Sequence, residues 1–191
     1  MNLSNTWLKV KIFFIRNFYI VGLVWWKHWS RFHRKYVEDD YDFVTLPDGW
    51  DPETAGLVLT LLRWQPDGGK ELWDVCRSAE WVEYCIKNVE EGFDQPSGAL
   101  DCDEFANWAV NVLDHKYLPC MLTVAWVSST KEILGHVLCI GRHNDGRLFH
   151  LGNWGHHGGF ISLRSLCKDI MDKTSSNEFV AWGLLDAELK L

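Results

Sequence analysis

Cys102 is the residue in this sequence best placed to act as a nucleophile. The stretch ALDCDEFANW sets its thiol directly before an apolar run with the spacing of a helix. At a helix start, the backbone N–H groups and the helix dipole stabilise the thiolate, which is the reactive form of cysteine. The neighbouring acids Asp101, Asp103 and Glu104 oppose this effect, because nearby negative charge raises the pKa of a thiol. Cys102 therefore needs a partner whose positive charge outweighs these carboxylates.

His136 is the histidine that could supply this charge. It follows Gly135 and begins a short, β-rich apolar run. A strand that starts there can pack its end against the N-terminus of the Cys102 helix, which would bring thiol and imidazole together. The alternative is a core histidine on an apolar strand face, which is the commoner role for such a residue.

Asn153 is the candidate for a third group that orients the imidazole. It follows the next strand-like run, and a turn at 144–146 lies about midway between His136 and Asn153. A hairpin that turns there can place the two side chains side by side, so that Asn153 accepts a hydrogen bond from the imidazole N–H. The alternative is that Asn153 is an ordinary turn residue of the GNWG sequence.

Two N–H groups are candidates for stabilising an oxyanion in such a site. One is the backbone N–H of Cys102, and the other belongs to the side chain of Gln95. Gln95 precedes Pro96 in a predicted loop at 92–98, and an ordinary loop role is its alternative.

The remaining cysteines and histidines predict no metal site. No CxxC pair occurs, and Cys76 and Cys85 fall on an apolar helical stripe, so we expect buried free thiols. Four histidines surround predicted turns without an i,i+4 pair or a nearby cysteine set, which predicts solvated loop residues. These are His143, His150, His156 and His157.

The elements that must position these residues follow from turn signals and periodicity. Asp51 is predicted to cap a helix that begins at Pro52 and ends near Trp64. Three further helices are predicted, one over 71–91, one that begins at about Cys102, and one from Ser162 to about Lys173. Strands are predicted over 121–127, 136–141, 147–152 and 178–185. Helices followed by a strand meander predict one α+β domain.

The N-terminal residues 1–36 differ from the rest of the chain. They hold seven Lys or Arg residues and no Asp or Glu, whereas the whole chain of 191 residues has a net charge of −7. The acidic total disfavours nucleic acid as a partner. A basic, Trp-rich helix suits either a membrane surface or packing on the body or a partner chain. No cleavable signal peptide is evident, so a cytoplasmic or membrane-surface location is expected.

Four segments, LDCDEFANWAVNVL, TVAWV, GHVLCIG and FHLGNWG, together resemble the transglutaminase-like cysteine peptidases of bacteria, a branch of the papain-like superfamily. The resemblance covers about residues 97–155. It implies a papain-like or transglutaminase-like core over 37–191, in which the helix carrying the cysteine packs on an antiparallel sheet. It assigns Cys102 as nucleophile, His136 as base and Asn153 as orienting group. Leu100 replaces the family's glycine, and Asn153 replaces its usual aspartate.

The function implied by this resemblance is acyl transfer by a cysteine peptidase or amidase, which hydrolyses a carboxamide of a protein or peptide. The alternatives are a protein-glutamine transglutaminase, a catalytically inactive papain-like binding module, and a membrane-associated interaction protein that acts through residues 1–36. No cofactor is required. Some periplasmic members with an acid on each side of the nucleophile depend on calcium, and Asp101 and Asp103 occupy these positions. The alternative is that these acids only complement the helix dipole.

Overall fold

The computed structural model of the chain describes residues 41, 43–65, 77–98, 100–127, 133–174 and 178–185. The prediction for residues 1–36 and the assignment of Cys76 to the core lie outside these ranges. Within them, no helix combines the length and the apolar character that crossing a membrane requires.

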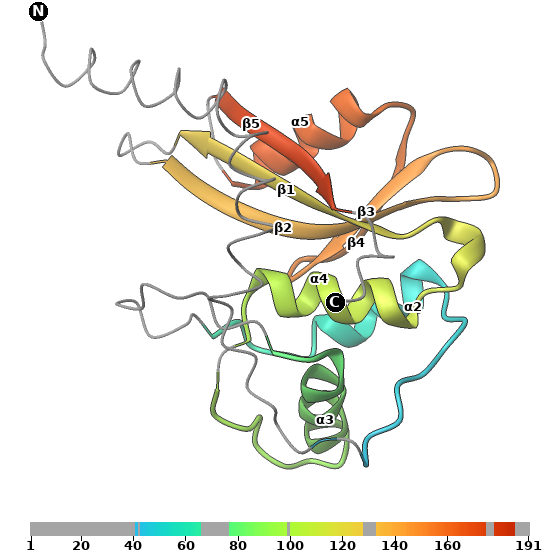
Figure 1. The fold of residues 1–191 in the computed structure, drawn as a ribbon, viewed down its shortest axis with the longest axis vertical. Coiled ribbons are helices and arrows are strands. Elements are labelled where there is room, and N and C mark those ends of the chain that lie inside the picture. Colours follow the sequence, from blue (N-terminus) through green and yellow to red (C-terminus); the bar gives the residue numbers. More distant parts are fainter. Residues whose placement is uncertain are drawn as a thin grey trace, which may run out of the picture.

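A five-stranded sheet with only antiparallel pairings forms the centre of the fold (Figure 1). Its strands run in the order β4-β3-β2-β1-β5, so that β2 lies in the middle. Their bounds are β1 Cys120–Val127, β2 Ile133–Arg142, β3 Leu148–Gly152, β4 Gly155–Phe160 and β5 Glu178–Leu185. Together with the helices, this sheet confirms the predicted α+β class.

Four α-helices pack around the sheet in the described residues. They are α2 Pro52–Leu59, α3 Ala79–Glu90, α4 Cys102–Val112 and α5 Leu163–Lys173, and a 3-10 turn, His115–Tyr117, leads into β1. The larger cluster of buried apolar side chains joins α2, α3 and α4 to the sheet through Cys139, Phe149 and Leu151. The smaller cluster joins α5 to Leu138 and Ile140. Because side chains alternate along a strand, α4 and α5 cover opposite faces of the sheet.

Three helix starts agree with the sequence-based prediction, two of them at the predicted capping residues Asp51 and Ser162 and one at the predicted start near Cys102. Asp51 caps α2 by accepting from the N–H of Thr54, Asp101 caps α4, and Ser162 caps α5. The end of α2 was placed too late, since this helix stops at Leu59 rather than near Trp64.

The helix predicted over 71–91 was wrong at its start. Ser78 caps α3, and its hydroxyl accepts from the N–H of Trp81. Arg77 is outside the helix because its N–H donates to the Glu104 side chain, at 3.0 Å. A long-range hydrogen bond therefore sets a boundary that the apolar stripe alone did not show.

Strand β4 is missing from the sequence-based prediction. Its sequence, GHHGGF, is glycine-rich and has no alternation of apolar and polar residues. Pairing with β3 nevertheless holds it in the sheet, with His156 opposite Leu151 and His157 opposite His150. The two histidines consequently point to opposite faces.

Candidate functional site

Cys102 is the first residue of α4, as its predicted role requires. Asp101 caps the helix, and its side chain accepts from the N–H of Asp103 at 3.2 Å. As a first-turn residue, Cys102 has one of the N–H groups that lack an acceptor within the helix. The helix start therefore supplies both the dipole and an N–H donor next to the thiol.

Glu104 explains part of the crowding of acids around Cys102. Its side chain is fully buried and accepts from two backbone N–H groups, those of Asp101 at 2.8 Å and Arg77 at 3.0 Å. Burial raises the pKa of Glu104 to about 7. Glu104 is therefore only partly ionised at neutral pH, and its carboxyl ties the start of α4 to the segment before α3.

His136 lies in the middle strand, β2, and its side chain is buried. Pairing between β2 and β3 ends at Cys139 and Leu151, so His136 lies beyond the end of β3. A Cβ built on Gly152, the last residue of β3, would be 3.8 Å from Nε2 of His136. This ring nitrogen is thus directed to the end of β3, directly before Asn153.

The imidazole of His136 is held in a poorly solvated place. Burial is the main reason that its pKa is lowered to about 4. The neighbouring His150 lowers this pKa further, and the charge of Asp101 raises it. Asp101, the residue before Cys102, is therefore close enough to His136 for an electrostatic interaction. At neutral pH the imidazole is uncharged.

Asn153 begins the short turn between β3 and β4. Its Oδ1 atom is buried and has no hydrogen-bond partner among the described residues. A buried acceptor without a donor costs free energy, so such an atom usually has a functional or a solvent partner. The structure therefore brings a ring nitrogen of His136 and an available acceptor to the same end of β3.

The face of β2 on which His136 lies is a constraint that the sequence did not reveal. His136 is opposite Val124 of β1 and shares the face of Leu138, which packs toward α5. The buried face of α4 packs on the other side of the sheet. The buried face of α4 and the side chain of His136 therefore lie on opposite faces of the sheet.

Three of the four other described cysteines, Cys85, Cys139 and Cys167, have surroundings that do not favour reactivity. Cys85 and Cys139 are buried in the larger apolar cluster. Burial raises the pKa of Cys85 to about 12 and raises that of Cys139 well above its ordinary value. Burial also raises the pKa of Cys167. Cys102, partly exposed at a helix start, differs from all three, and the predicted core role of Cys85 is confirmed.

Gln95 has a structural role in addition to any part in an oxyanion site. Its Oε1 accepts from the N–H of Arg63 at 2.6 Å, and its Nε2 donates to the Arg63 carbonyl at 2.9 Å. The amide thereby joins the loop before α4 to the segment after α2. One N–H of the Gln95 amide remains for another acceptor, and the oxyanion role stays a prediction.

Asp101, Cys102 and Asp103 form a compact group whose potential ligand atoms lie within 4.8 Å of one another. Calcium takes six to eight oxygen ligands, whereas one of these three groups is a sulfur. The Asp101 side chain is also engaged as the cap of α4. The group is therefore a poor match to a calcium cage, and the calcium site stays a prediction.

The prediction that the four downstream histidines are solvated loop residues was wrong for three of them, whereas His143 does lie in the loop after β2. His150 is completely buried in β3, and His156 and His157 are half-buried in β4. They form two groups with acids from distant segments, Glu53 with His143 and His156, and Asp169 with His150 and His157. These groups were not evident from the sequence, because their acids come from the distant helices α2 and α5.

Comparison of the chain with protein-family models, curated proteins and solved structures finds no match.

Proposed function

We propose that this protein is a cysteine-dependent acyl-transfer enzyme of the transglutaminase-like, papain-like kind, and that it hydrolyses a carboxamide bond in a protein or peptide. Cys102 is the nucleophile, His136 the base and Asn153 the group that orients the imidazole. The supporting observation is the convergence at one end of β3. Nε2 of His136 lies 3.8 Å from the Cβ position of Gly152, next to the buried, unpartnered Oδ1 of Asn153.

The order of the elements also supports this proposal. A helix that begins with a cysteine packs on an antiparallel sheet, the next-but-one strand carries the histidine, and the asparagine follows the strand after that. This is the order expected of the transglutaminase-like core. The indole of Trp154 lies against the His136 ring, with centroids 4.8 Å apart, and restricts access of water.

In the proposed mechanism the two nitrogens of His136 have different roles. Nε2, which lies near the end of β3, donates its hydrogen to Oδ1 of Asn153 in the reactive state, and Nδ1 is the base for the Cys102 thiol. Because the imidazole is uncharged at neutral pH, it is able to accept the thiol proton as Sγ reacts with an electrophile, either the substrate or an alkylating reagent. Nδ1 then accepts this proton as Sγ bonds to the carbonyl carbon.

The reaction continues through a tetrahedral oxyanion near the N–H of Cys102. The protonated His136 gives its proton to the leaving amine as the carbon–nitrogen bond breaks, and a thioester remains on Cys102. Water, deprotonated by His136, attacks this thioester and releases the acid and the thiol. With an amine in place of water, the same steps give transamidation.

A second candidate function is a papain-like binding module without catalysis. The pKa of His136, about 4, favours this candidate, because a base of such low pKa accepts the thiol proton poorly at neutral pH. Catalysis would require a substrate complex in which the pKa of His136 is higher than about 4, for example through a negative charge on the substrate close to the imidazole.

Alkylation of Cys102 by iodoacetamide, followed by mass spectrometry at each cysteine, tests the proposal. At pH 7 we expect Cys102 in the folded protein to react at least ten times faster than the same cysteine in urea-unfolded protein. His136→Gln should abolish this excess, whereas His115→Gln, an exposed histidine outside the site, should preserve it. Equal rates in folded and unfolded wild-type protein would contradict the enzyme proposal and favour the binding module.

The same rates, measured with calcium and with a chelator, test the metal prediction separately. A rate that depends on calcium would support the site at Asp101 and Asp103. An unchanged rate would exclude calcium as an activator of the thiol and leave the acids with their capping role.

A further inference from the structure

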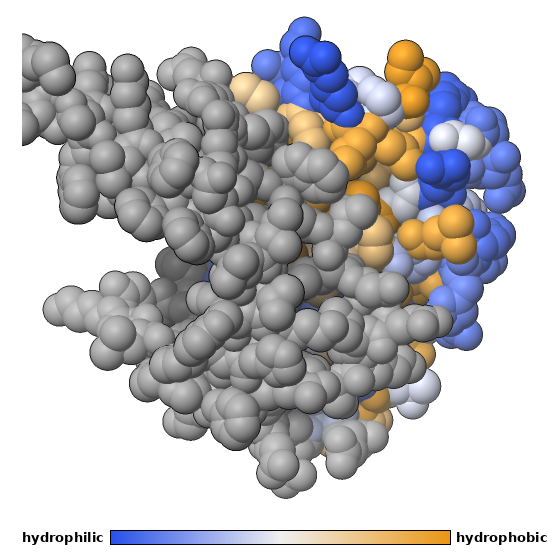
Figure 2. Space-filling model, turned by 45° about the horizontal axis from the view of Figure 1, so that its top comes forward, coloured by the Kyte–Doolittle hydropathy of each residue, from blue (hydrophilic) through white to orange (hydrophobic). Residues whose placement is uncertain are grey.

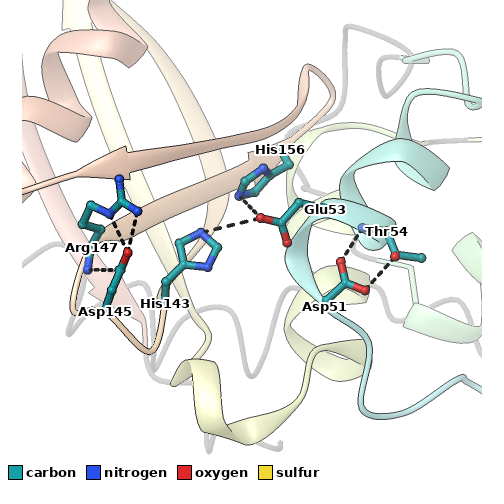
Figure 3. A network of polar contacts seen from close by, with 7 residues as sticks. All are labelled: Asp51, Glu53, Thr54, His143, Asp145, Arg147 and His156. Carbon is teal, nitrogen blue, oxygen red and sulfur yellow. Dashed lines mark hydrogen bonds and ion pairs between the residues drawn. The ribbon is translucent and has the colours of Figure 1, made fainter.

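A second group of polar side chains lies outside the proposed catalytic residues, where α2 meets the loop after β2 and strand β4. Glu53, His143 and His156 turn their polar ends toward one another (Figure 3). Nε2 of His143 lies 4.0 Å, and Nε2 of His156 lies 3.9 Å, from the same carboxylate oxygen, Oε1 of Glu53. Three segments that are far apart in the sequence thus meet at one oxygen atom.

The backbone around this group holds the three side chains in place. Asp51 accepts from the N–H of Thr54 at 2.8 Å and fixes the first turn of α2, which carries Glu53. A Cβ on Gly56 would lie only 2.5 Å from the backbone N of His156, so the absence of a side chain lets α2 approach β4 closely. The positions of Glu53 and His156 are therefore set by close packing of helix on strand.

The group borders a surface pocket of about 560 Å³, which Tyr117 also lines. Gly158 is in this wall, and a Cβ there would be 3.0 Å from Nε2 of His156 and 3.1 Å from Nε2 of His143. The glycine keeps the space beside both ring nitrogens free of protein atoms.

The ring nitrogen of His156 that faces Glu53 has no partner within hydrogen-bond distance in the described part of the chain. Its Nε2 is buried and forms no hydrogen bond with any described residue. Distances near 4 Å are too long for hydrogen bonds to Glu53. A buried ring nitrogen without a hydrogen-bond partner among these residues, 3.9 Å from a carboxylate oxygen, leaves room between the two atoms for a metal ion that both could bind.

The geometry points to a divalent transition-metal site, best suited to Zn²⁺, whose ligands are Glu53, His143 and His156. Two imidazoles and one carboxylate are a zinc ligand set with a fourth position for water, whereas calcium and magnesium prefer oxygen alone. Zinc bonds of about 2.0–2.2 Å place tetrahedral ligand atoms roughly 3.4 Å apart. Small side-chain movements from 3.9 and 4.0 Å would give this spacing.

The second histidine group does not support a similar proposal. Nε2 of His150 forms a hydrogen bond of 2.9 Å with Asp169. Lys173 is 4.0 Å from the same Asp169 oxygen. The Asp169 carboxylate is therefore already engaged by a hydrogen bond and a cation, and this group serves as an internal control.

Cobalt titration of the untagged, metal-free protein tests the zinc site. We expect one equivalent of Co²⁺ to bind, with visible d–d bands and without the sulfur-to-cobalt charge-transfer band that Cys102 as a ligand would add. Zn²⁺ should displace the cobalt. Glu53→Gln, His143→Asn and His156→Asn should each weaken binding at least tenfold. His157→Asn, the matched control in the same strand, should leave the affinity within about twofold.

Two results would overturn this inference: no saturable cobalt binding, or binding that persists unchanged in His143→Asn and His156→Asn. A charge-transfer band would place the metal at a cysteine instead. Glu53→Gln and His143→Asn keep the test valid if His156→Asn does not fold, since the side chains of Glu53 and His143 are 59% and 22% exposed. None of these outcomes depends on whether Cys102 is reactive.

Discussion

The imidazole of His136 lies against the indole of Trp154, with ring centroids 4.8 Å apart and planes tilted by 41°. The two residues come from β2 and from the turn after β3, and the contact removes one side of the imidazole from water. Because burial is the main cause of the low pKa of His136, the indole contributes directly to the state of the proposed base.

Replacement of Trp154 by Leu is therefore expected to raise the pKa of His136 from about 4 toward 6.5. The smaller side chain admits water, which stabilises the imidazolium. Histidine ring proton chemical shifts followed by NMR over pH 3–8 measure the change. Trp64→Leu, at a half-exposed position, is the matched control and should leave the His136 titration unchanged. An unaltered pKa in Trp154→Leu would mean that other groups bury the ring.

Asn153→Asp should raise the pKa of His136 by one unit or more, because it adds a negative charge next to the imidazolium. If the proposed triad is correct, the alkylation rate of Cys102 should then rise at pH 5–7, since a better base withdraws the thiol proton. Asn153→Ala should lower this rate without raising the pKa. A lack of response to both substitutions would place Asn153 outside the site.

Glu104→Gln should lower the free energy of unfolding by about 1–3 kcal/mol at pH 7, because a buried N–H loses its acceptor. The two carboxylate oxygens of Glu104 accept from the backbone N–H groups of Asp101 and Arg77. A glutamine side chain has one oxygen, so its NH2 group would face one of these two donors. Urea denaturation measures the loss. Glu80→Gln in the first turn of α3 is the control on a less buried acid, and we expect a change below about 0.5 kcal/mol.

His150 makes the stability of the protein depend on pH. Burial lowers its folded-state pKa to about 4, so between pH 6.5 and 4 the unfolded chain binds more protons at this residue than the folded protein does. The contribution of His150 to stability should therefore fall by about 2 kcal/mol as the pH is lowered from about 7 to about 5.

The comparison of wild type with His150→Gln isolates this effect. The free energy of unfolding should fall less steeply on acidification in the variant, because the variant lacks His150. His136, with a similarly low pKa, and Glu104, whose raised pKa acts in the opposite direction, titrate in both proteins and cancel in the comparison. Urea denaturation at several pH values gives the two curves. Parallel curves would show that His150 titrates normally in the folded protein.

Gly56→Ala should destabilise the protein by about 1–3 kcal/mol, because the added methyl group overlaps the backbone of His156. The helix cannot retreat without opening the larger apolar cluster, to which Ala55 and Leu59 belong. Leu57→Ala on the exposed side of α2 is the control, with little expected effect on stability. Thermal unfolding of both variants distinguishes close helix–strand packing from a general sensitivity of α2.

Local signals account for the parts of the fold that the sequence predicted. The caps at Asp51, Asp101 and Ser162 act within three residues, and the apolar runs of β1, β2 and β3 have the composition of strands. For the same reason, the placement of Cys102 at a helix start was predictable. The face of β2 that His136 occupies was not evident, because it depends on which helix covers which face.

The parts that escaped prediction depend on contacts between distant residues. The start of α3 depends on a hydrogen bond from Arg77 to Glu104, and β4 is held by pairing with β3 rather than by apolar alternation. The group of Glu53, His143 and His156 likewise exists only because α2 packs on β4 at Gly56. No local window of sequence contains these relationships.

The strand order has a consequence for synthesis of the chain on the ribosome. One edge of β1 pairs with β5, although β2, β3, β4 and α5 lie between these two strands in the sequence. During translation that edge has unpaired N–H and C=O groups until β5 emerges. The nascent chain is therefore open to misassociation at β1 during this interval, and pairing with β5 is expected to complete the described sheet.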